Sequence, residues 1–242
     1  MTTKACRVIV NCFLNGRDAR NNSPSSTSEC LQMIKNVINV ERAVPSETNY
    51  DLIIINHQTG FKIGDDYLNS LNNEPTKNGK IIVVNTENKG LSMDGFNTAF
   101  EMFQKDYDYW IFSEDDHILF AENYYDKLIK EFESLDNIGF LALAPKSKDL
   151  TIEHSGGGFG LAKTKSLKKI YDKFGKLPCL ETHKTRTAAE IFFTNAFTQI
   201  GLNIVENKTY CLAPINVHQC QDHMINFKGN ENDLPFLFKV GL

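Results

Sequence analysis

The chain has 242 residues, enough for one large α/β domain with a substantial core. Its hydrophobic fraction of 41% and charged fraction of 23% exclude a disordered or collagen-like chain. The formal net charge of -4 argues against nucleic acid as the main partner, because nucleic-acid-binding proteins carry a basic surface. A phosphate-bearing ligand would therefore need a metal ion, backbone amides or a few local bases to offset its charge.

The N-terminal region has a short apolar run that ends at Asn15 and Gly16, too short for a membrane span and without a small-residue cleavage site. We therefore expect no signal peptide, no integral membrane segment and a cytoplasmic protein, with action on a lipid acceptor at a membrane left open. The 6 cysteines contain no C-x-x-C pair, which argues against a zinc knuckle or a redox motif. Pairing of Cys211 with Cys220 stays open.

Apolar, β-branched runs alternate along the chain with segments of helical periodicity, a pattern typical of a parallel sheet covered by helices. The expected strands are residues 7–14, 51–56, 80–85, 109–113, 138–144 and 211–217. The expected helices are one that carries Leu31, Ile34 and Ile38 on one face, and those at 92–104, 124–135 and 187–200. A Gly-rich turn is expected at 156–160, and no linker divides the chain.

The main functional signal is the run Glu114, Asp115 and Asp116, which directly follows the apolar strand at 109–113. Ligands of open α/β sheets bind at the carboxyl ends of the strands. Three adjacent carboxylates repel one another unless they are solvated or bound to a cation, and an isolated triplet is more often a solvated loop. Beside a nucleotide, however, such hard oxygen ligands suit Mg²⁺ or Mn²⁺.

The stretch from Asn88 to Phe120 resembles the centre of GT-A glycosyltransferases, in particular family 2. In that family an Asn-x-Gly turn leads into a helix that carries an Asn, and Asn88, Gly90 and Asn97 match this part. The next strand of the family ends in an Asp-x-Asp signature, which Glu114 and Asp116 match in a Glu-Asp-Asp form. This form is also similar to N-acetylglucosaminyltransferases of the same fold.

Downstream segments follow in the order of the same family. Residues 154–160 resemble the glycine-rich segment that shapes the acceptor and sugar pocket, which implies roles for His154, Gly157 and Gly158. The helix at 187–200 resembles the one that carries the catalytic carboxylate, and Glu190 occupies that position by its spacing from Gly201. The run 214–218 resembles a late strand whose His completes the metal site, here His218.

The resemblance implies an α/β fold: a single, Rossmann-like GT-A domain over residues 1–242 with a mainly parallel sheet flanked by helices. A nucleotide-binding half would cover about 1–120, and an acceptor and catalytic half about 121–242. The implied reaction moves a sugar, with inversion, from a nucleotide diphosphate donor to an acceptor hydroxyl. The acceptor, whether a glycan, a lipid-linked molecule or a protein, is left open.

The resemblance also implies residue roles. Glu190 would take the proton of the acceptor hydroxyl, and Asp116 with His218 would bind Mn²⁺ or Mg²⁺. Glu114 and Asp115 would face the ribose and the sugar. Phe13 either stacks on the base or ends the first strand. Other histidines, His117 among them, are interpreted as packed or surface residues.

Two departures from the family pattern qualify these roles. Family members usually carry an acidic pair before the Ser or Thr at the end of the second strand, where an Asp reads uracil, whereas this chain has Asn56, His57, Gln58 and Thr59. We therefore expect Asn56, His57 and Thr59 at the donor base, with a weaker preference for uridine. The catalytic position is Glu190 rather than Asp, and the preceding residue, Ala189, is not acidic.

Two alternative functions remain. A non-catalytic module would keep the sheet and bind a nucleotide sugar without turnover, since a fold does not determine a function. A sugar-nucleotide pyrophosphorylase shares the fold type and uses acidic metal ligands. Such enzymes carry a Gly-rich, Arg-containing loop after the first strand, whereas residues 11–17 here contain a single Gly, so we expect this alternative less.

Overall fold

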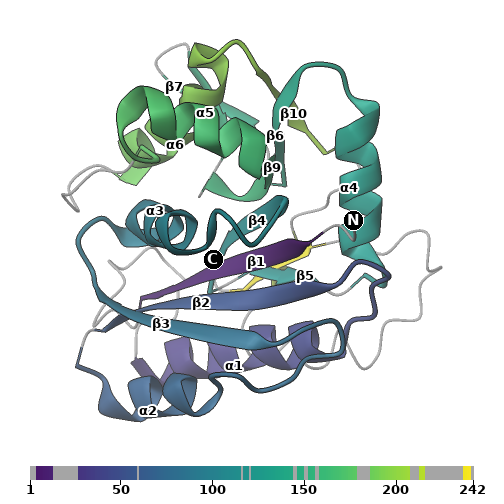
Figure 1. Ribbon diagram of the computed structural model, residues 1–242. Coiled ribbons are helices and arrows are strands. Elements are labelled where there is room, and N and C mark those ends of the chain that lie inside the picture. The colour runs from purple at the N-terminus through teal and green to yellow at the C-terminus, as the bar shows by residue number, and fades with distance from the viewer. Residues whose placement is uncertain are drawn as a thin grey trace.

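The structure is a computed structural model. It describes residues 4–12, 27–58, 60–115, 117–119, 121–143, 146–149, 152–155, 158–178, 186–207, 213–215 and 237–240. A seven-stranded sheet lies at its centre, with helices on both faces (Figure 1). The expected α/β fold with a mainly parallel sheet is confirmed.

The strands of this sheet follow the order β3-β2-β1-β4-β9-β6-β10. They are β1 (Ala5–Cys12), β2 (Tyr50–Gln58), β3 (Ile81–Glu87), β4 (Tyr109–Glu114), β6 (Ile138–Ala142), β9 (Gly160–Lys163) and β10 (Asn203–Glu206). β9 runs antiparallel to both of its neighbours, and the other pairs are parallel. The expected strands at 7–14, 51–56, 80–85, 109–113 and 138–144 are confirmed with small shifts of their ends.

Two helical layers cover the sheet and divide the core in two. The layer of α1 (Thr27–Ala43), α2 (Lys62–Ser70) and α4 (Tyr124–Ser134) packs on one face. The layer of α3 (Leu91–Phe103), α5 (Thr164–Phe174) and α6 (Arg186–Gln199) packs on the other face. The strands are apolar on both faces because each face is buried under a helical layer, as expected for a mainly parallel sheet. Among the described residues no helix is long and apolar enough to cross a membrane.

Two smaller sheets complete the described structure. β5 (His117–Leu119) pairs antiparallel with β12 (Leu237–Val240), and β12 pairs in parallel with β11 (Ala213–Ile215), which lies within the strand expected at 211–217. β7 (Lys146–Asp149) and β8 (Ile152–Ser155) form an antiparallel pair. Two residues separate β4 from β5 in the sequence, so the small sheet that contains β5 begins directly beyond the carboxyl end of β4.

The order in which successive strands are added to the sheet reverses between β1 and β4, although these two strands are parallel. β2 and β3 extend the sheet on one side of β1, whereas β4 lies on its other side. Ligands of open α/β sheets bind at such a reversal, beyond the carboxyl ends of the strands. The carboxyl ends of β1 and β4 are therefore the place to examine for a site.

Candidate functional site

The carboxyl end of β4 leads into the run Glu114, Asp115 and Asp116, which we call the acidic turn. Glu114 is half-buried, and Ser92 Oγ donates a hydrogen bond to its Oε1. Asp115 is only 1% exposed. Asp116, the predicted metal ligand, lies outside the described residues. The structure thus places Glu114 and Asp115 at the carboxyl end of β4, as the sequence predicted, and this end lies where the strand order reverses.

Ser92 was not among the predicted site residues. It lies in the first turn of α3, directly across from the end of β4, and is 8% exposed. Its hydrogen bond to Oε1 orients one oxygen of the Glu114 carboxylate. A serine beside the Gly90 turn at the start of a predicted helix was a readable signal for this role.

His117 closes the acidic turn from its far end. Its Nδ1 accepts a hydrogen bond from the Glu114 N–H at 3.0 Å, and its ring stacks on Phe159 with centroids 4.3 Å apart. The side chain is 3% exposed. This confirms the interpretation of His117 as a packed residue and shows that its imidazole shapes the turn.

An asparagine ladder lies at the carboxyl ends of β1, β2 and β3. Asn11, Asn56 and Asn85 are aligned across the three strands. Asn11 Nδ2 donates to Asn56 Oδ1 at 3.0 Å, and Asn56 Nδ2 donates to Asn85 Oδ1 at 3.0 Å and to Asp65 Oδ1 at 2.9 Å. Both the oxygen and the nitrogen of the Asn56 side-chain amide therefore make hydrogen bonds within the protein, and this side chain is fully buried. A contact between Asn56 and a donor base stays a prediction.

His57 points to the opposite face of the sheet from Asn56 because successive strand residues alternate. It is fully buried beneath α3, where a Cβ built on Gly95 would lie 3.3 Å from His57 Nε2. Its predicted role at the base likewise stays a prediction. Phe13 and Thr59, the other residues predicted near the base, lie outside the described residues.

The three residues that match the Asn-x-Gly motif and its helix surround the start of α3. Asn88 is half-buried before the helix, and Gly90 is its buried N-cap residue, with no side-chain hydrogen bond at the cap. Asn97 Oδ1 accepts a hydrogen bond from the Leu177 N–H at 2.8 Å, which ties α3 to the segment after α5. Asn97 thus makes a structural contact, and its predicted contact with the donor stays untested.

The residues predicted for acceptor and catalysis lie on the side of α6. His154 is buried in β8, and Gly158 has a φ of +61°, with Met93 and Phe193 nearest to the position of a Cβ. Glu190 is half-buried and is the fifth residue of α6, so it lies beyond the first turn, which contains no acidic residue. The helix expected at 187–200 begins one residue earlier, at Arg186. Gly157 and His218 lie outside the described residues.

Aromatic packing connects α6 to the acidic turn. The ring of Phe193, one helical turn after Glu190, lies 5.5 Å from that of Phe112 and 5.8 Å from that of Phe96. Phe112 is two residues before Glu114 in β4, and Phe96 is one turn after Ser92 in α3. Glu190 is therefore on a helix that packs directly on the strand and the helix that carry the acidic turn and its serine.

A divalent metal ion is implied by the family resemblance. Within the described part of the chain, no group of three or more His, Cys, Asp or Glu side chains is arranged to hold one. The chemistry of the acidic turn nevertheless fits such an ion, because its residues carry carboxylate oxygens and Mg²⁺ and Mn²⁺ prefer oxygen ligands.

No family model matches the chain, and no curated protein matches it in sequence. In three dimensions it is similar to TarS 1–349 from S. aureus, with a TM-score of 0.50, 12% identity, and coverage of 99% of this chain and 60% of that one. It is also similar to the mannosyltransferase PcManGT from Pyrobaculum calidifontis, solved with GDP-Man and Mn²⁺, with a TM-score of 0.52 and 10% identity. That match covers 86% of this chain and 55% of the other.

A cytidylyltransferase from Leptospira borgpetersenii serovar Hardjo-bovis matches at a TM-score of 0.45 and 11% identity, over 86% of this chain and 76% of that one, too low a score to support an inference. At 10% and 12% identity, the two better matches bear on the fold alone. The chain has a GT-A-like α/β fold. It spans only 60% and 55% of the two neighbours' lengths.

Proposed function

We propose that the protein is a metal-dependent glycosyltransferase that moves a sugar from a nucleotide diphosphate donor to an acceptor hydroxyl. This proposal rests on the acidic turn, because the turn directly follows β4 at the point where the strand order reverses, and ligands of such folds bind at this point. The similarity in fold to a mannosyltransferase solved with GDP-Man and Mn²⁺ supports it.

Asp116, with His218, would hold Mn²⁺ or Mg²⁺, and the Glu114 carboxylate would face the ribose. A bound divalent ion would stabilise the charge that develops on the departing diphosphate. Ser92 orients the Glu114 carboxylate before the ligand arrives, which reduces the entropy lost on binding. The Asp115 carboxylate would favour the positive charge that develops on the transferred sugar.

The asparagine ladder replaces the acidic base-reading pair of the resembled family. Because Asn56 is saturated with hydrogen bonds inside the protein, we propose that the ladder shapes the edge on which the base lies. An amide can donate or accept a hydrogen bond, whereas a carboxylate only accepts one. Because amides stand where the family has carboxylates, we expect no exclusive preference for uridine over guanosine, cytidine or thymidine diphosphates. Competition binding among UDP, GDP, CDP and dTDP measures this preference.

The deciding experiment measures the products that the protein releases. The purified protein is incubated with Mn²⁺ and a panel of nucleotide sugars, and the free nucleoside diphosphate is measured, because a transferase slowly hydrolyses its donor without an acceptor. We expect release that falls to background with EDTA and in Asp116→Ala. The matched control is Asp136→Ala, an exposed Asp between α4 and β6, which should release the diphosphate as the wild type does.

Two results would contradict the proposal. Pyrophosphate formed from a nucleoside triphosphate and a sugar 1-phosphate, with no diphosphate from any nucleotide sugar, would identify a nucleotidyltransferase. Metal-dependent binding of a nucleotide sugar without any product would identify a non-catalytic module.

A further inference from the structure

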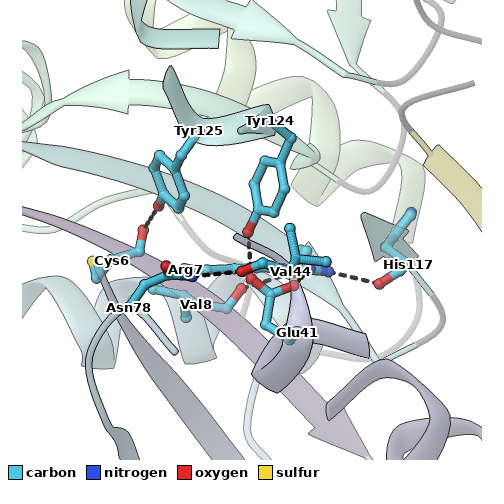
Figure 2. Close-up of polar contacts among 10 residues, drawn as sticks. Cys6, Arg7, Val8, Glu41, Val44, Asn78, His117, Tyr124 and Tyr125 are labelled. Carbon is cyan, nitrogen blue, oxygen red and sulfur yellow. Dashed lines mark hydrogen bonds and ion pairs between the residues drawn. The ribbon is translucent and has the colours of Figure 1, made fainter. Parts of the chain in front are cut away.

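Arg7 is a fully buried cation in the first strand, and its guanidinium contacts both ends of the acidic turn; Figure 2 shows its contact with His117. Arg7 Nε donates to Ser113 Oγ at 3.2 Å, directly before the turn. Arg7 Nη2 donates to the backbone oxygen of His117 at 2.6 Å, directly after it. One side chain therefore links the two residues that flank the three carboxylates.

A buried counter-charge holds the guanidinium in place. Glu41 of α1 pairs with Arg7 Nη1, and the Tyr124 hydroxyl donates to the other oxygen of Glu41 (Figure 2). The side chains of Arg7 and Glu41 are both 0% exposed. Burial lowers the pKa of Arg7, but the Glu41 carboxylate together with Tyr124 and Tyr50 outweighs it and the net pKa of Arg7 is raised, so the guanidinium stays charged. The contacts to the turn are thus charge-assisted hydrogen bonds.

The core itself gives no reason for a charge at this position. Ala5 and Ile9 point to the same face of β1 and pack in the apolar core, and a buried ion pair is on average no more stabilising than apolar residues of similar volume. What an apolar residue cannot do is donate to three oxygens at once. The planar fork of arginine has five N–H groups and does so here, toward Ser113, His117 and Glu41.

We propose that Arg7 is a positioning residue that holds the acidic turn in the geometry needed to bind a metal ion and a diphosphate. Glu41 and Tyr124 act through Arg7 by fixing its guanidinium. The role in metal binding rests on the proposed function, whereas the restraint on the turn can be measured independently of it.

Arg7→Lys separates the charge from the fork. A lysine keeps a cation beside Glu41, so the buried carboxylate stays paired, but its single ammonium cannot span Ser113 and the His117 carbonyl in the same way. Arg7→Met/Glu41→Gln removes both charges together and serves where the lysine variant does not fold, since Gln still accepts from Tyr124. The matched control is Arg42→Met, which removes the exposed pair with Glu74, 3.4 Å apart, from the same end of α1.

Two measurements are made on each folded variant. Hydrogen–deuterium exchange of a peptide covering 113–119 reports on the turn, where the Glu114 N–H is bonded to His117, and a peptide from β2 reports on the core. Calorimetry gives the affinity for GDP and for UDP in the presence of Mn²⁺. We expect faster exchange confined to the turn and a loss of affinity of about 10- to 100-fold, typical of residues that orient metal ligands. Arg42→Met should change neither.

Unchanged exchange at 113–119 in both Arg7 variants would overturn the inference, as would faster exchange with unchanged affinity in a protein whose wild type binds Mn²⁺ with either nucleotide. If the wild type shows no metal-dependent nucleotide binding, the proposed function is wrong, and the exchange measurement alone decides whether Arg7 restrains the turn. Faster exchange spread equally over the turn and β2 would reduce Arg7 to a general stabilising residue and would also overturn the inference.

Discussion

Gly95 of α3 packs directly on β1, and Gly95→Ala tests how the helix is seated. A Cβ at this position would lie 2.5 Å from Val10 Cγ2 and 2.8 Å from Val10 Cγ1, whereas carbon atoms make favourable contacts at about 3.5–4.0 Å. Val10 is 2% exposed in a central strand, and its β-branched side chain is stiff at χ1. The new methyl group must therefore push α3 away from the sheet by about 1 Å.

Two opposing effects determine the change in the free energy of unfolding. Replacing a helical Gly with Ala stabilises by about 1 kcal/mol, whereas overpacking a core costs about 1–3 kcal/mol. We therefore expect a net loss of about 1 kcal/mol for Gly95→Ala. Val10→Ala removes both methyl groups that clash, so in Gly95→Ala/Val10→Ala the overpacking disappears. The double variant should be more stable than the sum of the single changes by about 1–3 kcal/mol.

Urea unfolding of the wild type, both single variants and the double variant measures this coupling. Met102→Ala, at an exposed position of the same helix, is the control and should stay within about 0.5 kcal/mol of the wild type. Additivity of the two changes within about 0.5 kcal/mol would refute the close contact between α3 and β1. Because Ser92 lies one turn before Gly95, displacement of α3 should also weaken Mn²⁺-dependent nucleotide binding, and Val10→Ala should restore it.

Other predictions concern Ser92 and Asp126. Ser92→Ala removes the hydrogen bond to Glu114 and should weaken Mn²⁺-dependent nucleotide binding about tenfold by calorimetry, whereas Ser134→Ala, at an exposed position, should not. Partial burial raises the pKa of Asp126, but hydrogen bonds from Thr48, Glu47 and Ser46 outweigh it, and the net pKa is lowered. Asp126→Asn should therefore cost about 1 kcal/mol at pH 7. The difference from the wild type should begin to shrink as the pH falls below about 4, the ordinary pKa of an Asp in the unfolded chain, and vanish once the pH is below the lowered pKa of the folded protein. A pH-independent difference would contradict this.

The long elements could be predicted from the sequence, and the short ones could not. β2 was readable because both of its faces are buried, which leaves a continuous apolar run, and the partly buried β3 keeps such a run from Ile81 to Val84. β9 has four residues and runs antiparallel between β4 and β6, a position that only the assembled sheet determines. α5 was readable but missed, since Leu167, Ile170 and Tyr171 recur at helical spacing.

The position of the candidate site was predictable, but its support was not. Glu114 and Asp115 directly follow an apolar strand, and strand ends are where ligands bind in such sheets. The contact from Arg7 to Ser113 joins residues 106 positions apart, and its partner depends on β1 lying beside β4. The single available signal was a charged residue within an apolar strand, which marks a buried partner without identifying it.

Glu190 is the residue whose predicted role the structure leaves to experiment, and Glu190→Gln separates the two roles it can have. As a general base it must accept the proton of the acceptor hydroxyl, which Gln cannot do, so transfer should fall about a hundredfold or more while donor binding stays unchanged. As a structural residue in the second turn of α6 it gains little from the helix dipole, which acts within the first turn. A structural role therefore predicts a small change in the unfolding temperature and a normal rate. With an acceptor identified by screening, near-normal transfer by a folded Glu190→Gln protein would exclude Glu190 as the base, and donor hydrolysis that still requires Mn²⁺ would leave the acidic turn as the centre of the reaction.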